Sequence, residues 1–201
     1  NDRIHLKQLH FPTGDIMIES TVSRVRIENC FLEAGEINLN RANNDILINN
    51  CYFKGLSLRD CKRIELVNCT IVENAKEKSN PKPCITGPFK GSINNCVIYS
   101  KSTYALVSNK EDKAAYDIRY SLVFGQAGTL RYSDRNSLAN QKEFDSSVSR
   151  FYKSISQAAK FGDSAHPYRL QKFSPGHLSG YKDRSMGIQV DDRGDLMDIE
   201  P

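Results

Sequence analysis

The six cysteines and four histidines are the side chains of this sequence best suited to metal binding or nucleophilic chemistry. Neither group has the spacing that such chemistry needs. There is no C-x-x-C or H-E-x-x-H pattern, and the histidines are scattered along the chain. The nucleophile motif G-x-S-x-G, the P-loop and the dinucleotide fingerprint are also missing. We therefore expect no metal site, and we interpret the cysteines as core residues.

Most of the cysteines belong to a short repeated phrase in which Asn precedes Cys and apolar residues flank the pair. The phrase recurs in steps of 21, 18 and 27 residues, a range typical of solenoids. Apolar and polar residues alternate between the phrases, which indicates short strands and no helices. A polar insertion at 73–83 explains the longest step. Unequal steps favour a parallel β-helix over a leucine-rich repeat, whose L-x-x-L-x-L frame is absent. The phrases contain Cys30, Cys51, Cys69 and Cys96.

The asparagine of each phrase has a mechanical explanation. A sharp turn between strands needs one residue in the left-handed region, which Asn tolerates better than any residue except Gly. Stacked coils would place these amides about 4.8 Å apart, so that they can form a hydrogen-bonded ladder. The following cysteines would point inward side by side, a geometry that disfavours disulfides, and we expect free thiols. The pairing of Cys61 and Cys84, which lie outside the phrase, stays open.

These patterns predict an all-β solenoid, with about six coils of a parallel β-helix over residues 1–132. From Ser133 onward the spacing of apolar residues becomes helical, through 137–144 and then up to Ala159, with Gly162 as a stop. We expect one or two helices there to cap the last coil, followed by an irregular tail, so that residues 133–201 pack on the solenoid as one domain. We also expect the chain to be part of a larger protein.

The tail carries a motif with a known likeness. It resembles a "DYRL…SPAIDAG…DIGA" pattern that commonly ends secreted bacterial β-helix proteins. The residues that match its successive parts are Tyr168-Arg169-Leu170, Ser174-Pro175, Gly180 and Met186-Gly187-Ile188. With the coils, this resembles right-handed parallel β-helix proteins of the pectate-lyase-like superfamily, of the bacterial secreted or surface type. The resemblance covers roughly residues 14–190 and implies an extracytoplasmic or cell-surface location. It does not define an activity, because one fold hosts many functions.

Enzymes of that superfamily bind acidic polysaccharide along one sheet, through outward side chains of successive coils. If the strands near residues 16–18, 37–39 and 56–58 form that sheet, their Ile and Leu residues point inward and the residues between and after them point outward. Lysines of the insertion would overhang the same surface. The inward residues are Ile16, Ile18, Ile37, Leu39, Leu56 and Leu58. The expected binding residues are Glu19, Asn38, Asn40, Ser57, Arg59, Lys76, Lys78 and Lys82.

The outward side chains of this sheet, which form a row across the coils, give little support for catalysis. Hydrolases of the group use clustered Asp residues, and the row contains no stacked pair of them. A lyase uses an Arg or Lys base next to other cations, and Arg59, with Asp60 and Lys62 at the adjacent turn, is the candidate set. The alternative interpretation of these residues is an ordinary solvated face. The polar cluster at 131–135 is expected to join the last coil to the cap.

The composition of the chain limits the kinds of partner that it can bind. The net charge of +4 comes from interspersed charges of both signs, which falls short of the basic stripe of a nucleic-acid-binding protein. No apolar run is long enough for a membrane span. We therefore expect a non-catalytic module that recognises a glycan, such as an acidic polysaccharide, or a protein partner. The alternatives are a polysaccharide lyase or glycoside hydrolase acting on an acidic polysaccharide, and a structural spacer. No cofactor is expected, except calcium if the chain is a lyase.

Overall fold

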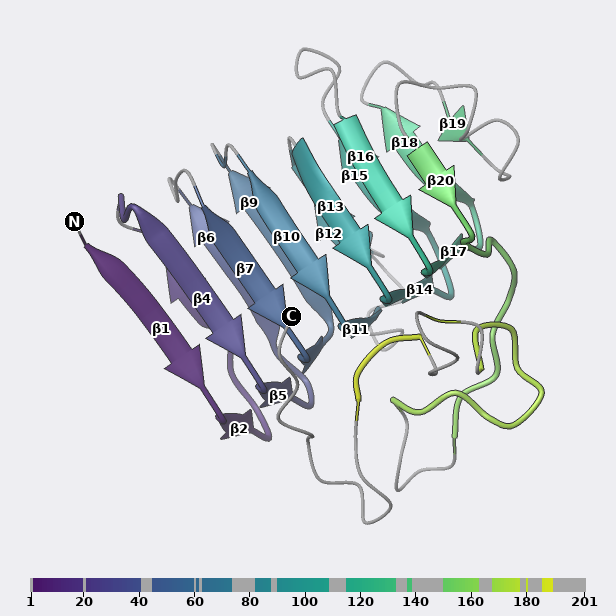
Figure 1. Cartoon of the computed structure of the whole chain (residues 1–201), viewed down its shortest axis with the longest axis horizontal. Coiled ribbons are helices and arrows are strands. Elements are labelled where there is room, and N and C mark those ends of the chain that lie inside the picture. The colour runs from purple at the N-terminus through teal and green to yellow at the C-terminus, as the bar shows by residue number, and fades with distance from the viewer. Residues whose placement is uncertain are drawn as a thin grey trace.

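The chain winds through three parallel sheets, and consecutive strands enter the three sheets in turn (Figure 1). The computed structural model describes residues 2–19, 21–40, 45–59, 61, 63–73, 82–87, 90–108, 115–132, 137–138, 150–162, 168–177, 180 and 186–189. Within them, strands β1 to β18 form six successive triplets, each of which we call a coil. The predicted all-β parallel solenoid is therefore confirmed.

Each sheet contains one strand from every coil. Sheet A consists of β1 (Arg3–Lys7), β4 (Arg24–Glu28), β7 (Ile46–Asn49), β10 (Ile64–Val67), β13 (Lys90–Asn94), β16 (Ala115–Arg119) and β20 (Arg150–Tyr152). Sheet B consists of β2 (His10–Phe11), β5 (Phe31–Leu32), β8 (Tyr52–Phe53), β11 (Thr70–Val72), β14 (Val97–Ser100) and β17 (Leu122–Gly125). Sheet C consists of β3 (Ile16–Ile18), β6 (Glu36–Asn40), β9 (Gly55–Arg59), β12 (Ile85–Thr86), β15 (Tyr104–Ser108), β18 (Gly128–Tyr132) and the antiparallel β19 (Ser137–Leu138).

The core is a set of columns of apolar side chains that runs through the coils. In sheet A, Ile27, Ile48, Leu66 and Ile93 are in register and completely buried. Alternation along each strand sends these residues inward and their neighbours outward. All six residues predicted to point inward from sheet C are buried as well. Because the buried alternate positions are apolar in every coil, the hydrophobic effect fixes the register of the strands.

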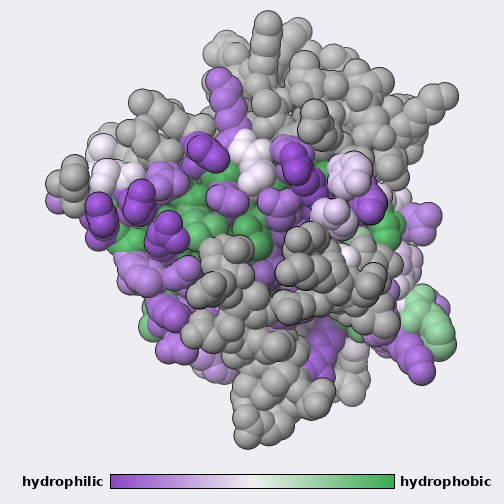
Figure 2. All heavy atoms as spheres, viewed as in Figure 1, coloured by the Kyte–Doolittle hydropathy of each residue, from purple (hydrophilic) through white to green (hydrophobic). Residues whose placement is uncertain are grey.

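The outer face of sheet A is polar. Figure 2 shows mostly hydrophilic side chains on the face of the molecule seen in Figure 1, around a smaller apolar area. Exposed ion pairs occur on this face, including Arg24 with Asp45 at 2.9 Å and Arg119 with Asp117 at 2.6 Å. Such exposed pairs contribute little to stability, so we interpret this face as a solvated surface.

The corner between sheets A and B contains the predicted asparagine turns. Asn29, Asn50, Asn68 and Asn95 have φ angles of 53°, 50°, 52° and 51°, so each lies in the left-handed region. Asn50 Nδ2 donates to Asn29 Oδ1 at 2.9 Å, and Asn95 Nδ2 donates to Asn68 Oδ1 at 2.8 Å. The ladder is interrupted in the middle, where Asn68 Nδ2 reaches Asn49 Oδ1 at 3.5 Å instead of Asn50. The amide stack is therefore confirmed, in two pieces.

The cysteines that follow these asparagines are buried free thiols, as expected, but they also form hydrogen bonds. Cys51 Sγ donates to the carbonyl of Asn49 at 3.1 Å and accepts the N–H of Cys30 at 3.4 Å. Ser121 occupies the equivalent place in the next coil after Cys96, and its Oγ accepts the N–H of Cys96 at 3.0 Å. The position therefore requires a small side chain that can donate and accept, which explains why Cys and Ser exchange there.

Thiol accessibility gives the first testable prediction. All cysteines except Cys61 are completely buried, which keeps a bulky reagent away from their thiols. Burial also raises the pKa of the Cys51 and Cys96 thiols, and that of Cys84 to about 12. Cys61 is only half-buried, and its thiol donates to the Leu39 and Arg59 carbonyls, not to Cys84. We expect a bulky thiol reagent to modify one cysteine quickly in the folded protein and the other five only on unfolding. Cys61→Ser should remove the fast phase, and several equally fast thiols would contradict the buried stack.

The expected helical cap differs from the structure wherever the structure describes that region. Residues 137–138 and 150–152 form strands, and no helix occurs among the described residues; 139–149 lie outside them. Strand β20 pairs with β16 and begins a further coil, in which Lys153 has a φ of 45° and Ser154 Oγ accepts the N–H of Ser121. Apolar residues on both sides of such a tight turn have a spacing like that of a helix. This spacing explains why the sequence predicted a helix where the structure has a strand and a turn.

The tail covers the outer face of sheet B. Tyr168, Met186 and Ile188 are buried in one apolar cluster with Tyr52 and Val97. The green to yellow segment in Figure 1 follows this side of the stack. Sheet B therefore has an apolar outer layer of side chains, whereas sheet C leaves a row of polar side chains open to solvent.

Candidate functional site

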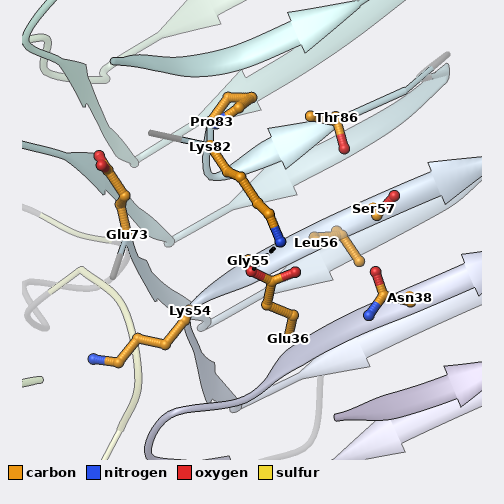
Figure 3. Close-up of a pocket in the computed structure, with 10 residues that line it drawn as sticks. All are labelled: Glu36, Asn38, Lys54, Gly55, Leu56, Ser57, Glu73, Lys82, Pro83 and Thr86. Atoms are coloured by element: carbon orange, nitrogen blue, oxygen red, sulfur yellow. Dashed lines mark hydrogen bonds and ion pairs between the residues drawn. The ribbon is translucent and has the colours of Figure 1, made fainter. Parts of the chain in front are cut away.

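A groove on the outer face of sheet C brings together polar side chains from three successive coils. Asn38 of β6, Ser57 of β9 and Thr86 of β12 are in register on neighbouring strands (Figure 3). Because the strands are parallel and stacked, equivalent side chains repeat about every 4.8 Å. The groove has a volume of about 220 Å³, below the roughly 300–1,000 Å³ of sites that enclose a small molecule. It is therefore suited to part of an extended ligand that lies across the coils.

One ion pair forms an edge of the groove. Lys82 Nζ lies 3.4 Å from Glu36 Oε1, and Figure 3 shows the ammonium pointing at this carboxylate. Asp15 Oδ1 accepts the backbone N–H of Glu36 at 2.7 Å. The next strand has Gly55 opposite Glu36, and a Cβ there would be 3.4 Å from the Glu36 side chain. This distance is an ordinary van der Waals contact, so the Glu36 side chain packs directly over Gly55 of β9.

Two other charged residues of the groove wall have structural partners. Glu73 is buried, and its carboxylate accepts hydrogen bonds from the Ser100 and Ser102 hydroxyls and, at 3.2 Å, from the Ser102 N–H. Lys54 donates to the Tyr52 hydroxyl, and its Nζ lies 4.7 Å from the ring centroid. In Figure 3 both side chains point away from the Glu36–Lys82 pair. Glu73 and Lys82 also flank residues 74–81, so both ends of the insertion are tied to the stack.

The sequence-predicted site residues fall into three groups. The groove contains Asn38, Ser57 and Lys82. Asn40 and Arg59 are paired in register at the far ends of β6 and β9, and the exposed Glu19 follows β3. Outside the described residues lie Asp60, Lys62, Lys76 and Lys78.

Sequence reasoning missed Glu36 and Thr86. Glu36 lies two residues before Asn38, so strand alternation places it on the same face, and this signal was available. Thr86 follows the insertion, where the repeat spacing is lost, so its register with Ser57 depends on the three-dimensional stack.

The arrangement is suited to hydrogen bonding. An amide and two hydroxyls can each donate to and accept from a polar ligand without the cost of desolvating a charge. The carboxylates of Glu36 and Glu73 do not face each other as a general acid and base would. Within the described ranges, no three His, Cys, Asp or Glu side chains are grouped so that they could hold a metal ion.

The fold and this groove define a parallel β-solenoid whose sheet C carries a polar groove that is open to solvent. No family model, curated protein or solved structure matches the chain. The part of the chain that the structure describes has no helix that could cross a membrane.

Proposed function

We propose that the chain is a non-catalytic, right-handed parallel β-helix module of the pectate-lyase-like superfamily that binds a glycan along the outer face of sheet C. The row of Asn38, Ser57 and Thr86 carries this proposal. Uncharged donors and acceptors at a fixed repeat suit the hydroxyl groups of a polymer that lies across the coils. In keeping with the tail motif, the module works in a larger secreted or surface protein.

A binding screen followed by matched substitutions tests the proposal. The screen uses neutral and acidic polysaccharides, including dextran and polygalacturonate, and calorimetry gives the Kd of the tightest binder. We expect Asn38→Ala and Ser57→Ala each to weaken that binding by about 3- to 10-fold, the value of one neutral hydrogen bond. Ser92→Ala makes the same change as Ser57→Ala on the outer face of sheet A and should leave the Kd unchanged. If no polysaccharide binds, the glycan proposal fails and a protein partner takes its place.

A polysaccharide lyase or hydrolase is the second candidate, because Arg59 is exposed at the end of the same face. An ultraviolet assay for unsaturated uronate on polygalacturonate would detect a lyase. Product that disappears in Arg59→Ala would support this candidate over the binding module. Product that survives the substitution would exclude Arg59 as the base.

A further inference from the structure

Residues 186–189 of the tail, which we call the strap, lie across three coils at the corner of sheets A and B. Three consecutive backbone N–H groups of the strap donate to the stack. Gly187 N–H donates to the Asn95 carbonyl at 2.7 Å, and Ile188 N–H donates to Thr70 Oγ1 at 2.9 Å. Gln189 N–H donates to Asn50 Oδ1 at 2.7 Å, beside the point where the asparagine ladder is interrupted.

The side chains of the strap are buried as well. Met186 is 3% exposed and Ile188 is 7% exposed, in the cluster that contains Tyr52 and Val97. Gln189 is also buried, and its Nε2 donates back to the Gly187 carbonyl at 2.7 Å. The surface under the strap thus provides apolar contacts for the Met186 and Ile188 side chains. It also provides an oxygen acceptor for the backbone N–H of each of residues 187–189.

Gly187 is the residue for which this surface is most selective. Its φ of 92° lies in a region that other residues rarely adopt, and this turn brings successive N–H groups to one side, as in a backbone nest. A Cβ at this position would lie 2.3 Å from Thr70 Oγ1 and 3.0 Å from Val97 Cγ2. Conformation and space therefore both require glycine.

We propose that this surface is a peptide-recognition site for the pattern apolar–Gly–apolar–Gln, and that it accepts the strap of a second copy of the chain in place of its own. An exchanged strap makes the same hydrogen bonds and buries the same side chains, which makes exchange a low-cost route to a dimer. The chain's own strap competes at an effective concentration on the order of millimolar. Exchange is therefore expected only as the protein concentration approaches that range.

The first arm of the test uses the full-length Gly187→Ala chain, whose own strap cannot dock, and a synthetic peptide with the sequence of residues 185–190. We expect saturable binding by calorimetry and a rise in Tm. A peptide with Ala in place of Gly should bind at least about ten-fold more weakly, and the wild-type chain should bind the glycine peptide more weakly than the variant does. If far-UV circular dichroism shows that Gly187→Ala is unfolded, Ile188→Ala replaces it. That change weakens docking of the chain's own strap by removing buried apolar carbons, and it adds no steric clash.

The second arm measures sedimentation of the chain without peptide at up to about 1 mM. The wild type and Gly14→Ala should form dimers, and Gly187→Ala should stay monomeric. Gly14 also has a positive φ, but a Cβ there would have open space, so this variant keeps a normal strap. Absence of peptide binding to the folded variant, or equal binding of both peptides, would overturn the recognition site. A wild type that stays monomeric throughout would overturn the second copy as its occupant.

Discussion

Asn50→Ala is expected to lower the free energy of unfolding by about 2–5 kcal/mol. The side chain is completely buried, and its loss removes the hydrogen bonds that it forms with Asn29 Oδ1 and with the Gln189 N–H. An unsatisfied buried polar group costs about 1–3 kcal/mol, and an alanine in the left-handed region costs about 1–2 kcal/mol more. Urea unfolding followed by circular dichroism measures the change.

Two control variants separate the two contributions. Asn50→Gly removes the same hydrogen bonds without the strain at a φ of 50°, so it should cost less than Asn50→Ala. Asn38→Ala makes the same change on the open face of sheet C and should alter the stability by no more than about 0.5 kcal/mol. Equal losses at positions 38 and 50 would be incompatible with a stacked amide ladder.

Gly35→Ala is expected to cost about 3 kcal/mol or more, because neighbouring coils meet at this residue. A Cβ would lie 2.0 Å from the carbonyl oxygen of Gly14 in the preceding coil, so one coil must move. The Gly35 carbonyl also accepts the Lys54 N–H of the following coil at 2.8 Å. Movement at Gly35 would therefore disturb three coils together, at the upper end of the cost of overpacking.

The matched control is Gly14→Ala, measured in the same urea titration. Gly14 has a φ of 108° and open space around the added Cβ, so its substitution tests backbone strain alone and should cost about 1–2 kcal/mol. The φ of Gly35 is not positive, so its substitution tests the steric contact. A larger loss at position 14 than at position 35 would show that the coils are less closely packed than the structure indicates.

The regular part of the fold could be predicted because each coil repeats the same local physics. Alternating apolar residues fix the inward positions, and the asparagine that follows β4, β7, β10 and β13 indicates a left-handed turn. The signal fades where other residues take the same places, as Tyr120 and Lys153 do at the turn and Ser121 and Ser154 do after it. Nothing in their identity distinguishes such a turn from one turn of a helix, so the strand β20 was missed.

The candidate site could be predicted only in part, because it depends on register across the insertion. Asn38 and Ser57 lie in coils of regular spacing, and alternation places both on the outer face. Thr86 and Lys82 follow a stretch of unrepeated sequence, so their neighbours are set by stacking. The role of Glu73 was also hidden, since its partners Ser100 and Ser102 are more than 25 residues away in the sequence.

The corner between sheets A and B has one further consequence, which concerns how this protein can change over evolution. Two residues separate the strands at this corner in every coil, although successive corners are between 18 and 33 residues apart. The variation in length therefore lies in the rest of each coil, and most of it lies in the connections that enter and leave sheet C. Doubling a flexible loop costs only about 0.6 kcal/mol, so these connections can accept insertions that leave the stack intact. New binding loops can thus be added beside the open sheet one coil at a time, and the 73–83 insertion marks where a designed loop should be grafted first.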